Sequence, residues 1–454
     1  MKLQKHVIAG LSVLAIVVSA CGSDDDSSSA DTETTEVVAA TDATETTEAA
    51  ATGDTETTEA AGDAGAEGPL ECGLASGEEA TGEPIPVGAV VGETGPADFS
   101  SAAKGAGAFF DCVNANGGIN GRPIDYKVED DSWDPEVAAA AARGLVEDDE
   151  VVAMIGSTSF VECAANASYY DEQEILVIAG VGVPRECFFS RNIAPTNQGP
   201  RLSGIGAAQY AVEQGAESLA CVSNVIPNFG AWVCEGITAY GETVGIPVDS
   251  FSGQPDGSDA ETIVLQAMEA DTDAVVVVEP GPLVAAYLQI VEAQGDETPW
   301  YAPTSAYDLS FPEAVGDYWD NRLFAQIELV ELDSTGPDNT LWGDVMDAYG
   351  SDSDPRDSFS QAGLLAAKIF VDTTLQMDPD SIDRATVTEA LRAVSDYETD
   401  LICGNWYFGD GDRHQANHAG RIVEMVPEGI GFTTVKDCHE VEDPELADVL
   451  AAEG

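Results

Sequence analysis

The sequence predicts an α/β protein made of two lobes, each a doubly wound, Rossmann-like arrangement of parallel strands and helices. From residue 85 onward, short apolar runs of strand length alternate with longer helical stretches. The alternation stops near residues 191–200 and then starts again. Without a leader and a tether, roughly 370 residues remain, which is enough for two domains with separate cores.

The first 20 residues predict a signal peptide. Lys2 and Lys5 precede an apolar run, residues 7–20, that is too short to span a bilayer as a mature helix. The stretch Val18-Ser19-Ala20-Cys21 resembles the lipobox of bacterial lipoproteins, which implies cleavage before Cys21 and lipidation of its sulfur. The alternative is a plain secretory signal followed by a cysteine without a role.

Residues 21–84 are expected to form a disordered acidic tether. Thr-Glu repeats dominate this stretch, and it lacks Lys, Arg and aromatic residues, so it cannot bury a core. An alternative is that the acidic run binds calcium or a partner. For the whole chain, 17 Lys and Arg against 83 Asp and Glu give a formal net charge of −66, which excludes a nucleic-acid function. A charge of this size also suggests a salty medium, because dissolved ions screen the self-repulsion.

Eight cysteines follow Cys21, and an even number in an exported chain implies disulfides. The sequence contains no C-x-x-C pair, the pattern that would suggest a metal site. The sequence leaves the connectivity open, and we take pairing between nearest neighbours as the expectation. The expected pairs are Cys72 with Cys112, Cys163 with Cys187, Cys221 with Cys234, and Cys403 with Cys438.

The first lobe is expected to contain strands at residues 84–91, 124–128, 151–155 and 175–179, with helices at residues 100–116 and 137–147 and between the last two strands. Asp134 and Pro135 give the second helix an N-cap and a proline at its first position. The last two strands and their crossover helix form a β-α-β unit, and ligands of parallel sheets bind beyond the carboxyl ends of the strands. Residues 156–160 and 180–183 lie there and offer amides and hydroxyls for a carboxylate or carbonyl oxygen, although a turn with helix-capping serines is the alternative.

The ordered series in this lobe resembles a known family. The series comprises Thr94-Gly95-Pro96, the turn at residues 115–124, the strand end at residues 128–131, Asp134-Pro135 and residues 155–159. It is similar to the substrate-binding proteins of branched-chain amino acid ABC transporters, here in a lipoprotein form, from residue 85 to about residue 435. The resemblance implies the type I periplasmic-binding fold, with two doubly wound Rossmann-like lobes joined by a three-strand hinge.

The second lobe is expected to contain helices at residues 202–214, 229–242, 260–270 and 283–293 and strands at residues 218–223, 246–251, 274–278 and 300–303. A strand at residues 323–330 should return to the first lobe, which helices at residues 340–349, 359–375 and 384–394 complete. By similarity to the family, a last crossing near residues 404–408 sends a strand at residues 420–425 into lobe two. Lobe one would then span residues 85–195 and 331–403, lobe two residues 196–330 and 404–436, and an acidic tail residues 437–454.

Catalytic patterns are missing from the sequence. It has no H-E-x-x-H, P-loop or complete G-x-G-x-x-G, and residues 156–160 lack the second glycine of a nucleophile elbow. His414 and His418 have the spacing of a metal pair, but they follow a Gly/Asp-rich loop and are expected to be surface histidines. We therefore expect no enzyme, cofactor or metal.

A binding cleft needs only donors, acceptors and apolar walls from both lobes. All expected ligand-binding residues follow predicted strand ends, and for each of them the alternative is a structural role in a turn or helix cap. The expected residues are Phe99, Ser157, Thr158, Ser159, Phe160 and the backbone of Val181, Gly182 and Val183 from lobe one, and Phe229, Glu279, Ser305 and Tyr307 from lobe two.

The resemblance assigns roles to some of these residues. In amino-acid-binding members, lobe-one hydroxyls and amides hold the carboxylate, a threonine and an acidic residue hold the ammonium, and a lobe-two aromatic closes over the ligand. Phe229 matches the aromatic and residues 157–159 match the hydroxyls. Val183 stands where the threonine is expected, Phe160 is close to the serine, and the acidic position falls near Ser305 or Ala306, although Glu279 could supply the charge.

These departures favour an amide, an organic acid or an aromatic compound over a leucine-type ligand. The expected protein is a monomeric, extracytoplasmic solute-binding lipoprotein that captures a small amino acid-like, amide or organic-acid ligand, closes its lobes and docks on ABC transporter permease subunits. A lipid anchor would be its contact with the membrane. The alternatives are a ligand-sensing receptor of the same fold and a secreted hydrolase.

Overall fold

The computed structural model describes residues 70–226, 228–308, 310–426 and 431–449. The predicted signal peptide, Cys21 and residues 21–69 of the predicted tether lie outside the described residues. In the part of the chain that the structure describes, no helix combines the length and apolar character needed to cross a membrane.

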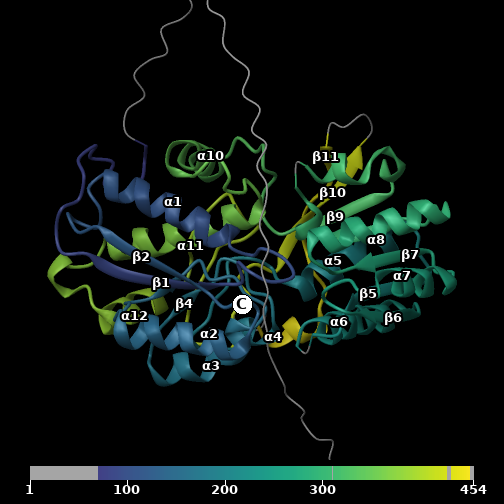
Figure 1. Cartoon of the computed structure of the whole chain (residues 1–454), viewed down its shortest axis with the longest axis horizontal. Coiled ribbons are helices and arrows are strands. Elements are labelled where there is room, and N and C mark those ends of the chain that lie inside the picture. Colours follow the sequence, from purple (N-terminus) through teal and green to yellow (C-terminus); the bar gives the residue numbers. More distant parts are fainter. Residues whose placement is uncertain (1–69, 227, 309, 427–430, 450–454) are drawn as a thin grey trace, which may run out of the picture. The chain divides into compact units, whose positions relative to one another are not determined.

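The first lobe contains a parallel sheet of four strands in the order β2-β1-β3-β4. Its strands are β1 (Ile85–Val91), β2 (Ile124–Asp130), β3 (Met154–Ile155) and β4 (Val177–Ile178). Its helices are α1 (Ser101–Ala115), α2 (Pro135–Arg143) with a π-helical turn (Gly144–Asp148), α3 (Glu162–Glu172), α4 (Arg185–Phe188), α10 (Pro337–Tyr349), α11 (Ser358–Thr374) and α12 (Arg384–Arg392). Figure 1 shows α1 and α11 above this sheet and α2 and α3 below it.

Local sequence signals account for several of these elements. The Asp134 carboxylate accepts hydrogen bonds from the amides of Glu136 and Val137, so α2 begins where the sequence predicts. Helix α11 is capped in the same way, because Asp357 and Ser360 exchange side-chain and backbone hydrogen bonds.

The second lobe contains a sheet of seven strands in the order β11-β10-β9-β8-β7-β5-β6. The strands are β5 (Leu219–Asn224), β6 (Val248–Gly253), β7 (Ala274–Val277), β8 (Trp300–Pro303), β9 (Leu323–Ile327), β10 (Ala419–Val426) and β11 (Gly431–Glu440). The helices are α5 (Pro200–Glu213), α6 (Gly230–Val244), α7 (Ala260–Glu269), α8 (Gly281–Gln294) and α9 (Phe311–Val315), with short 3₁₀ turns at Thr304–Ala306 and Asp317–Trp319. Two further 3₁₀ turns lie at Pro379–Ser381, between α11 and α12 of lobe one, and at Pro444–Leu446, after β11. Strands β5 to β9 are parallel, whereas β10 and β11 are antiparallel additions.

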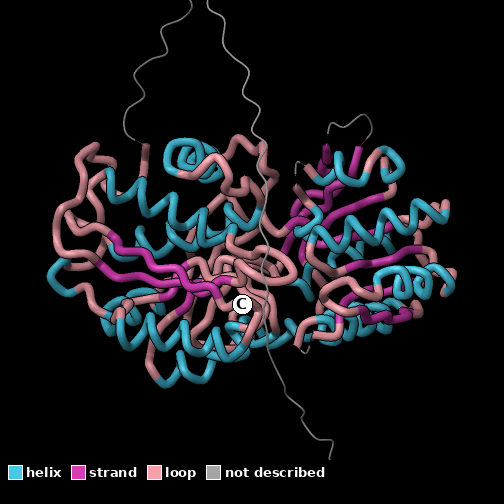
Figure 2. Tube along the Cα trace, viewed as in Figure 1, coloured by secondary structure: helices cyan, strands magenta, loops and turns pink. Residues whose placement is uncertain are grey.

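Strand β5 shows why the central strands of this lobe are continuous apolar runs. Leu219 and Cys221 belong to one buried cluster, and Ala220 and Val222 belong to another. Helices cover both faces of such a sheet, so alternate side chains enter separate cores. Figure 2 shows the two groups of strands with loop segments between them.

One sequence prediction about this lobe is wrong. The predicted strand at residues 323–330 does not return to lobe one: β9 pairs with β8 on one side and β10 on the other, inside the second sheet. The backbone leaves this sheet only after Ile327. An apolar strand is suited to either sheet, and pairing with β8 and β10 decides which one it joins.

Three chain crossings connect the lobes and lie side by side. The amide side chain of Asn417, in the third crossing, donates to the carbonyl oxygens of Thr196 (3.2 Å) in the first and Glu328 (3.0 Å) in the second. Gln415 donates to the carbonyl oxygen of Gln198 at 2.7 Å. These buried amides join the three segments of the hinge. The third crossing lies at Gln415 and Asn417, later in the chain than the crossing predicted near residues 404–408.

The folded body is longer at both ends than expected. Residues 70–84, predicted as tether, pack on lobe one: Cys72 is fully buried, and the amide of Ala80 donates to the carbonyl of Asn114. At the other end, β11 extends into the predicted acidic tail, and the Asp443 carboxylate forms a buried ion pair with Arg201 at 2.6 Å. Both stretches are polar overall, so composition did not reveal their few buried anchors.

Four disulfides are formed among the described residues, and they join Cys72 to Cys112, Cys163 to Cys187, Cys221 to Cys234 and Cys403 to Cys438. This is the nearest-neighbour pairing expected from the sequence. The first bridge attaches residues 70–84 to α1, and the last attaches the loop after α12 to β11.

Candidate functional site: a cavity between the lobes

A cavity of about 50 Å³ lies where the strand ends of the two lobes meet. Lobe one and the first crossing contribute Phe99, Phe160, Val181, Gly182, Val183, Asn197 and Phe359; lobe two and the second crossing contribute Pro200, Phe229, Val278, Glu279, Pro280, Pro303, Thr304, Ser305 and Glu328. A space this small accepts only a compact ligand while the lobes keep this arrangement.

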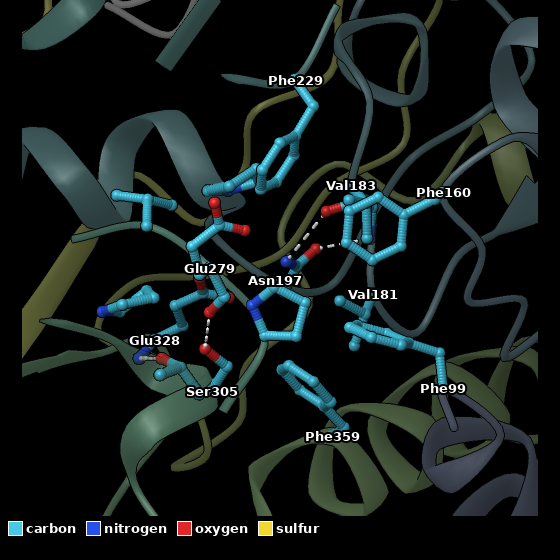
Figure 3. Close-up of a pocket in the computed structure, with 16 residues that line it drawn as sticks. Phe99, Phe160, Val181, Val183, Asn197, Phe229, Glu279, Ser305, Glu328 and Phe359 are labelled. Carbon is cyan, nitrogen blue, oxygen red and sulfur yellow. Dashed lines mark hydrogen bonds between the residues drawn. The ribbon is translucent and has the colours of Figure 1, made fainter. Parts of the chain in front are cut away.

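Four phenylalanine rings form much of the wall (Figure 3). The ring of Phe160 stands 4.9 Å from that of Phe99 and 5.2 Å from that of Phe229 across the lobe boundary. Phe160 also stacks on Trp133 at 4.2 Å, and Phe359 lies 5.8 Å from Phe99. Because its neighbours fix Phe160 in position, its contact with Phe229 favours closed lobes.

Glu279 is the first of two buried carboxyl groups at the cavity. It follows β7, and Figure 3 shows its carboxyl group pointing toward Phe229. Oε2 accepts a hydrogen bond from Asn224 Nδ2 at 2.8 Å, whereas Oε1 is buried without a partner among the described residues. Burial raises the pKa of Glu279 to about 8, against the hydrogen bond from Asn224 and with a smaller contribution from Asp259.

Glu328 is the second carboxyl group, at the start of the second crossing. Its amide donates to Thr304 Oγ1 at 2.9 Å, and its side-chain Oε2 is buried and lacks a partner in the described chain. Burial raises the pKa of Glu328 to about 7, although hydrogen bonds from Asn197 and from the amides of Gly199 and Gln198 favour the charged form.

The side-chain donors that line the cavity are already engaged. Asn197 exchanges two hydrogen bonds with the backbone of Gly182, at 2.7 and 3.2 Å. The Thr304 hydroxyl donates to the carbonyl of Gln326 at 3.1 Å, and the Ser305 hydroxyl donates to the carbonyl of Glu279 at 2.6 Å. Among the described lining residues none is Lys, Arg or His.

Eight of the expected ligand-binding residues line the cavity: Phe99, Phe160, Val181, Gly182, Val183, Phe229, Glu279 and Ser305. The structure does not bring Ser157, Thr158, Ser159 or Tyr307 into its wall.

These four side chains have structural partners instead. Ser157 Oγ accepts from the amide of Val90 at 3.1 Å, and Thr158 joins β1 to the loop after β4 through its backbone. Ser159 Oγ donates to Asp131 and accepts from the amides of Val161 and Glu162 at the start of α3. The Tyr307 hydroxyl accepts from the amide of Leu332 at 3.2 Å. The cap duty weighed from the sequence describes Ser159, whereas the other three residues make contacts between more distant segments of the chain.

Sequence reasoning missed Asn197, Pro200, Val278, Pro280, Pro303, Thr304, Glu328 and Phe359 as lining residues. Val278, Pro280, Pro303 and Thr304 stand beside or between expected residues at strand ends, so a wider window would have included them. Glu328 lies within a stretch predicted as strand, and Phe359 comes from a helix in the distant C-terminal part of lobe one. No local pattern distinguishes these two.

The histidine prediction is wrong for His414. This side chain is 1% exposed, and its Nδ1 lies 2.8 Å from the carbonyl oxygen of Ser190. Burial lowers the pKa of His414 to about 4, so the ring is neutral near pH 7. His418 contacts Glu440 at 2.6 Å, and the residues that the structure describes contain no group of side chains suited to hold a metal ion.

Comparison with known proteins gives three results. The family model described as periplasmic binding protein matches residues 84–429. An amino acid binding protein from Pseudomonas aeruginosa is 33% identical over 95 residues, which is 20% of this chain and a quarter (25%) of that protein.

Solved structures share the fold. A branched chain amino acid ABC transporter from Thermus thermophilus with bound valine has a TM-score of 0.70 at 15% identity, over 79% of this chain and 97% of that one. A fatty acid ABC transporter substrate-binding protein from Thermomonospora curvata has a TM-score of 0.70 at 19% identity, over 82% and 95%. A possible leucine/isoleucine/valine-binding protein from Rhodopirellula baltica has a TM-score of 0.68 at 16% identity, over 78% and 96%.

Proposed function

The chain belongs to the periplasmic binding protein family of ABC transporter substrate-binding proteins, and from this premise we propose that it is an extracytoplasmic solute-binding lipoprotein that captures a small ligand between two closing lobes. Delivery to the permease subunits of an importer would follow closure. The type I periplasmic-binding fold expected from the sequence is confirmed by the matched family and by the fold neighbours.

The observation that carries the proposal is a cavity whose wall comes from both lobes. Phe99 and Phe160 on one side and Phe229 and Glu279 on the other face the same space. A ligand that contacts both walls stabilises the closed arrangement over any open one, because it gains those contacts only on closure. The three crossings provide the hinge for this movement.

The ligand class expected from the sequence remains an amino acid-like compound, an amide or an organic acid. The fold neighbours include a protein with bound valine and a fatty acid ABC transporter substrate-binding protein, so the fold is compatible with several ligand classes. In this chain Val183 lines the cavity at the position where the resemblance expects a threonine. A compact ligand with an apolar body fits this wall better than a zwitterion.

Thermal unfolding of the full chain, purified in mild detergent, tests ligand capture. A ligand that binds only the folded protein, at about 100 times its dissociation constant, adds roughly 2.7 kcal/mol to the free energy of unfolding. The panel comprises amino acids, amides, carboxylates, aromatic acids and amines. Phe229→Ala should lose the shift and Val244→Ala, an exposed valine at the far end of α6, should keep it.

A silent panel with the wild-type chain, or an equal shift in Phe229→Ala, would contradict ligand capture in this cavity.

The lipid anchor is tested separately with a Cys21→Ser variant. After export, this variant should be found in the medium and no longer in the membrane fraction. Retention of that variant on the membrane would contradict lipidation at Cys21.

A further inference from the structure

The polar side chains at the cavity offer more free hydrogen-bond acceptors than free donors. Glu279 Oε1 and Glu328 Oε2 are buried oxygens without a partner among the residues that the structure describes, and these two side chains belong to residues that are 2% and 4% exposed. A buried carboxylate oxygen without a donor destabilises the protein, so a molecule that brings donors to it binds with a gain.

The protein itself has little to donate here. The hydroxyls of Thr304 and Ser305 and the amide of Asn197 donate to backbone carbonyls nearby. A hydrogen bond from Asn197 also favours the charged form of Glu328 and lowers the pKa of that carboxyl. The three prolines in the wall have no N–H group. A carboxylate ligand, which only accepts, would therefore find a free side-chain donor only in the O–H group of a protonated Glu279 or Glu328, and none once both carboxyls are charged.

The rest of the wall suits a positive charge. Four phenyl rings border the space, and a cation is attracted to the face of an aromatic ring. The net charge of −66 acts in the same direction at long range, because it concentrates cations near the molecule and repels anions.

From this geometry we propose that the cavity binds a small primary or secondary ammonium ion with an apolar body and without a carboxylate, whose N–H groups donate to Glu279 and Glu328. This inference rests on the proposed function and specifies its ligand. It departs from the amino acid-like and organic-acid classes, since both carry a carboxylate.

Proton release gives the proposal a pH signature. Burial places the pKa of Glu279 at about 8 and that of Glu328 at about 7, so each carboxyl is largely protonated below these values. The ammonium keeps its proton and each carboxyl that pairs with it releases one to solvent. Affinity should rise about tenfold per pH unit below pH 7 for each proton released, and level off near pH 8. Asp259 and Tyr287 are the titratable groups that interact electrostatically with Glu279. The groups that hydrogen-bond to Glu328 carry no charge.

The test varies the head group on one body. Isobutylamine, isobutyramide, isobutyrate, valine and isobutyltrimethylammonium are titrated into the full chain by calorimetry, at pH 6, 7 and 8. A second series places the same heads on a benzyl body, so that ligand size is varied independently. We expect the amine to bind at least tenfold more tightly than any other head, and more tightly at pH 8 than at pH 6.

Matched variants locate the effect. Glu279→Gln keeps the size of the side chain but removes its charge, and should weaken amine binding at least tenfold and reduce the pH dependence. Glu269→Gln, an exposed glutamate on α7, should change neither.

Each other result overturns the proposal. Tighter binding of valine, isobutyrate or the amide would assign the cavity to that class and leave ligand capture intact. Equal binding of the trimethylated cation would remove the role of N–H donation. A silent series for both bodies would overturn the ammonium assignment, and the broader thermal panel would then decide whether ligand capture fails with it.

Discussion

Two loops that follow strands, one in each lobe, differ in how their polar side chains are used. In the loop after β3, Ser157 and Ser159 bind the amides of Val90, Val161 and Glu162, and only Phe160 faces the cavity. In the loop after β7, Glu279 reaches the cavity, and one of its oxygens has no partner in the described part of the chain. A short hydroxyl side chain near the start of a helix hydrogen-bonds to nearby backbone amides, whereas a longer side chain extends beyond them.

The same comparison holds for two buried carboxyl groups. Glu162, at the start of α3, accepts a hydrogen bond from the Tyr170 hydroxyl at 2.7 Å. Glu279 has Asn224 for one oxygen and nothing described for the other. Burial raises the pKa of both to about 8, so the pKa does not separate them. The oxygen without a described partner, at a cavity, is the reason that we propose a binding role for Glu279 and a structural one for Glu162.

The largest effect is expected from Phe160→Ala, which removes the one side chain of the first loop that faces the cavity. It deletes the stack on Trp133 and the contacts with Phe99 and Phe229, and should cost about 3–5 kcal/mol of unfolding free energy. Urea unfolding measures this loss. Ligand affinity should fall by on the order of tenfold or more in the folded fraction, measured by calorimetry. A stable variant with full affinity would show that the aromatic wall has no role.

Ser159→Ala tests the structural role of the first loop. It removes the hydrogen bonds to the Val161 and Glu162 amides and leaves the buried Asp131 carboxyl without this donor, so we expect a loss of about 2 kcal/mol in urea unfolding. Affinity for the ligand identified by the matched series should stay within about twofold of the wild type. A tenfold loss of affinity at unchanged stability would restore Ser159 to the binding site.

Glu279→Gln tests the second loop through the pH dependence of stability without ligand. The pKa of Glu279 rises from 4.5 to about 8 on folding, so its stabilising effect is complete below pH 4.5 and is lost as the pH rises toward 8. The glutamine has no charge to bury. The unfolding free energy of the variant relative to the wild type should therefore be about 1–2 kcal/mol higher at pH 8 than at pH 5. Thermal unfolding at both pH values measures the difference, with Glu269→Gln as the unaffected control. A difference that does not change with pH would mean that Glu279 is charged throughout.

The smallest effect is expected from Tyr307→Phe. It deletes the hydroxyl that accepts from the Leu332 amide and keeps the ring against Phe432, 5.3 Å away. Stability should fall by about 1 kcal/mol with affinity unchanged. Equilibrium urea unfolding and calorimetry would report both values, and a loss of affinity would place this hydroxyl in contact with the ligand.

Much of the fold follows from local signals in the sequence. Asp134 and Pro135 determine where α2 begins, and apolar runs such as residues 274–278 predict buried strands. The cavity was predictable in its position, because ligands of parallel sheets bind at strand ends. The sequence could not predict which polar side chains enter the cavity, since a serine has the same sequence signature whether it caps a helix or faces a ligand.

The sequence by itself therefore determined the alternation of elements, the two lobes and the aromatic residues at the strand ends, because these depend on periodicity and short-range chemistry. The tertiary structure alone decided that β9 joins the second sheet, that Phe359 and Glu328 meet Phe160 across the cavity, and that residues 70–84 pack on α1. These contacts join residues far apart in the chain. Their energy comes from burial and hydrogen bonds that exist only once the lobes have folded and come together.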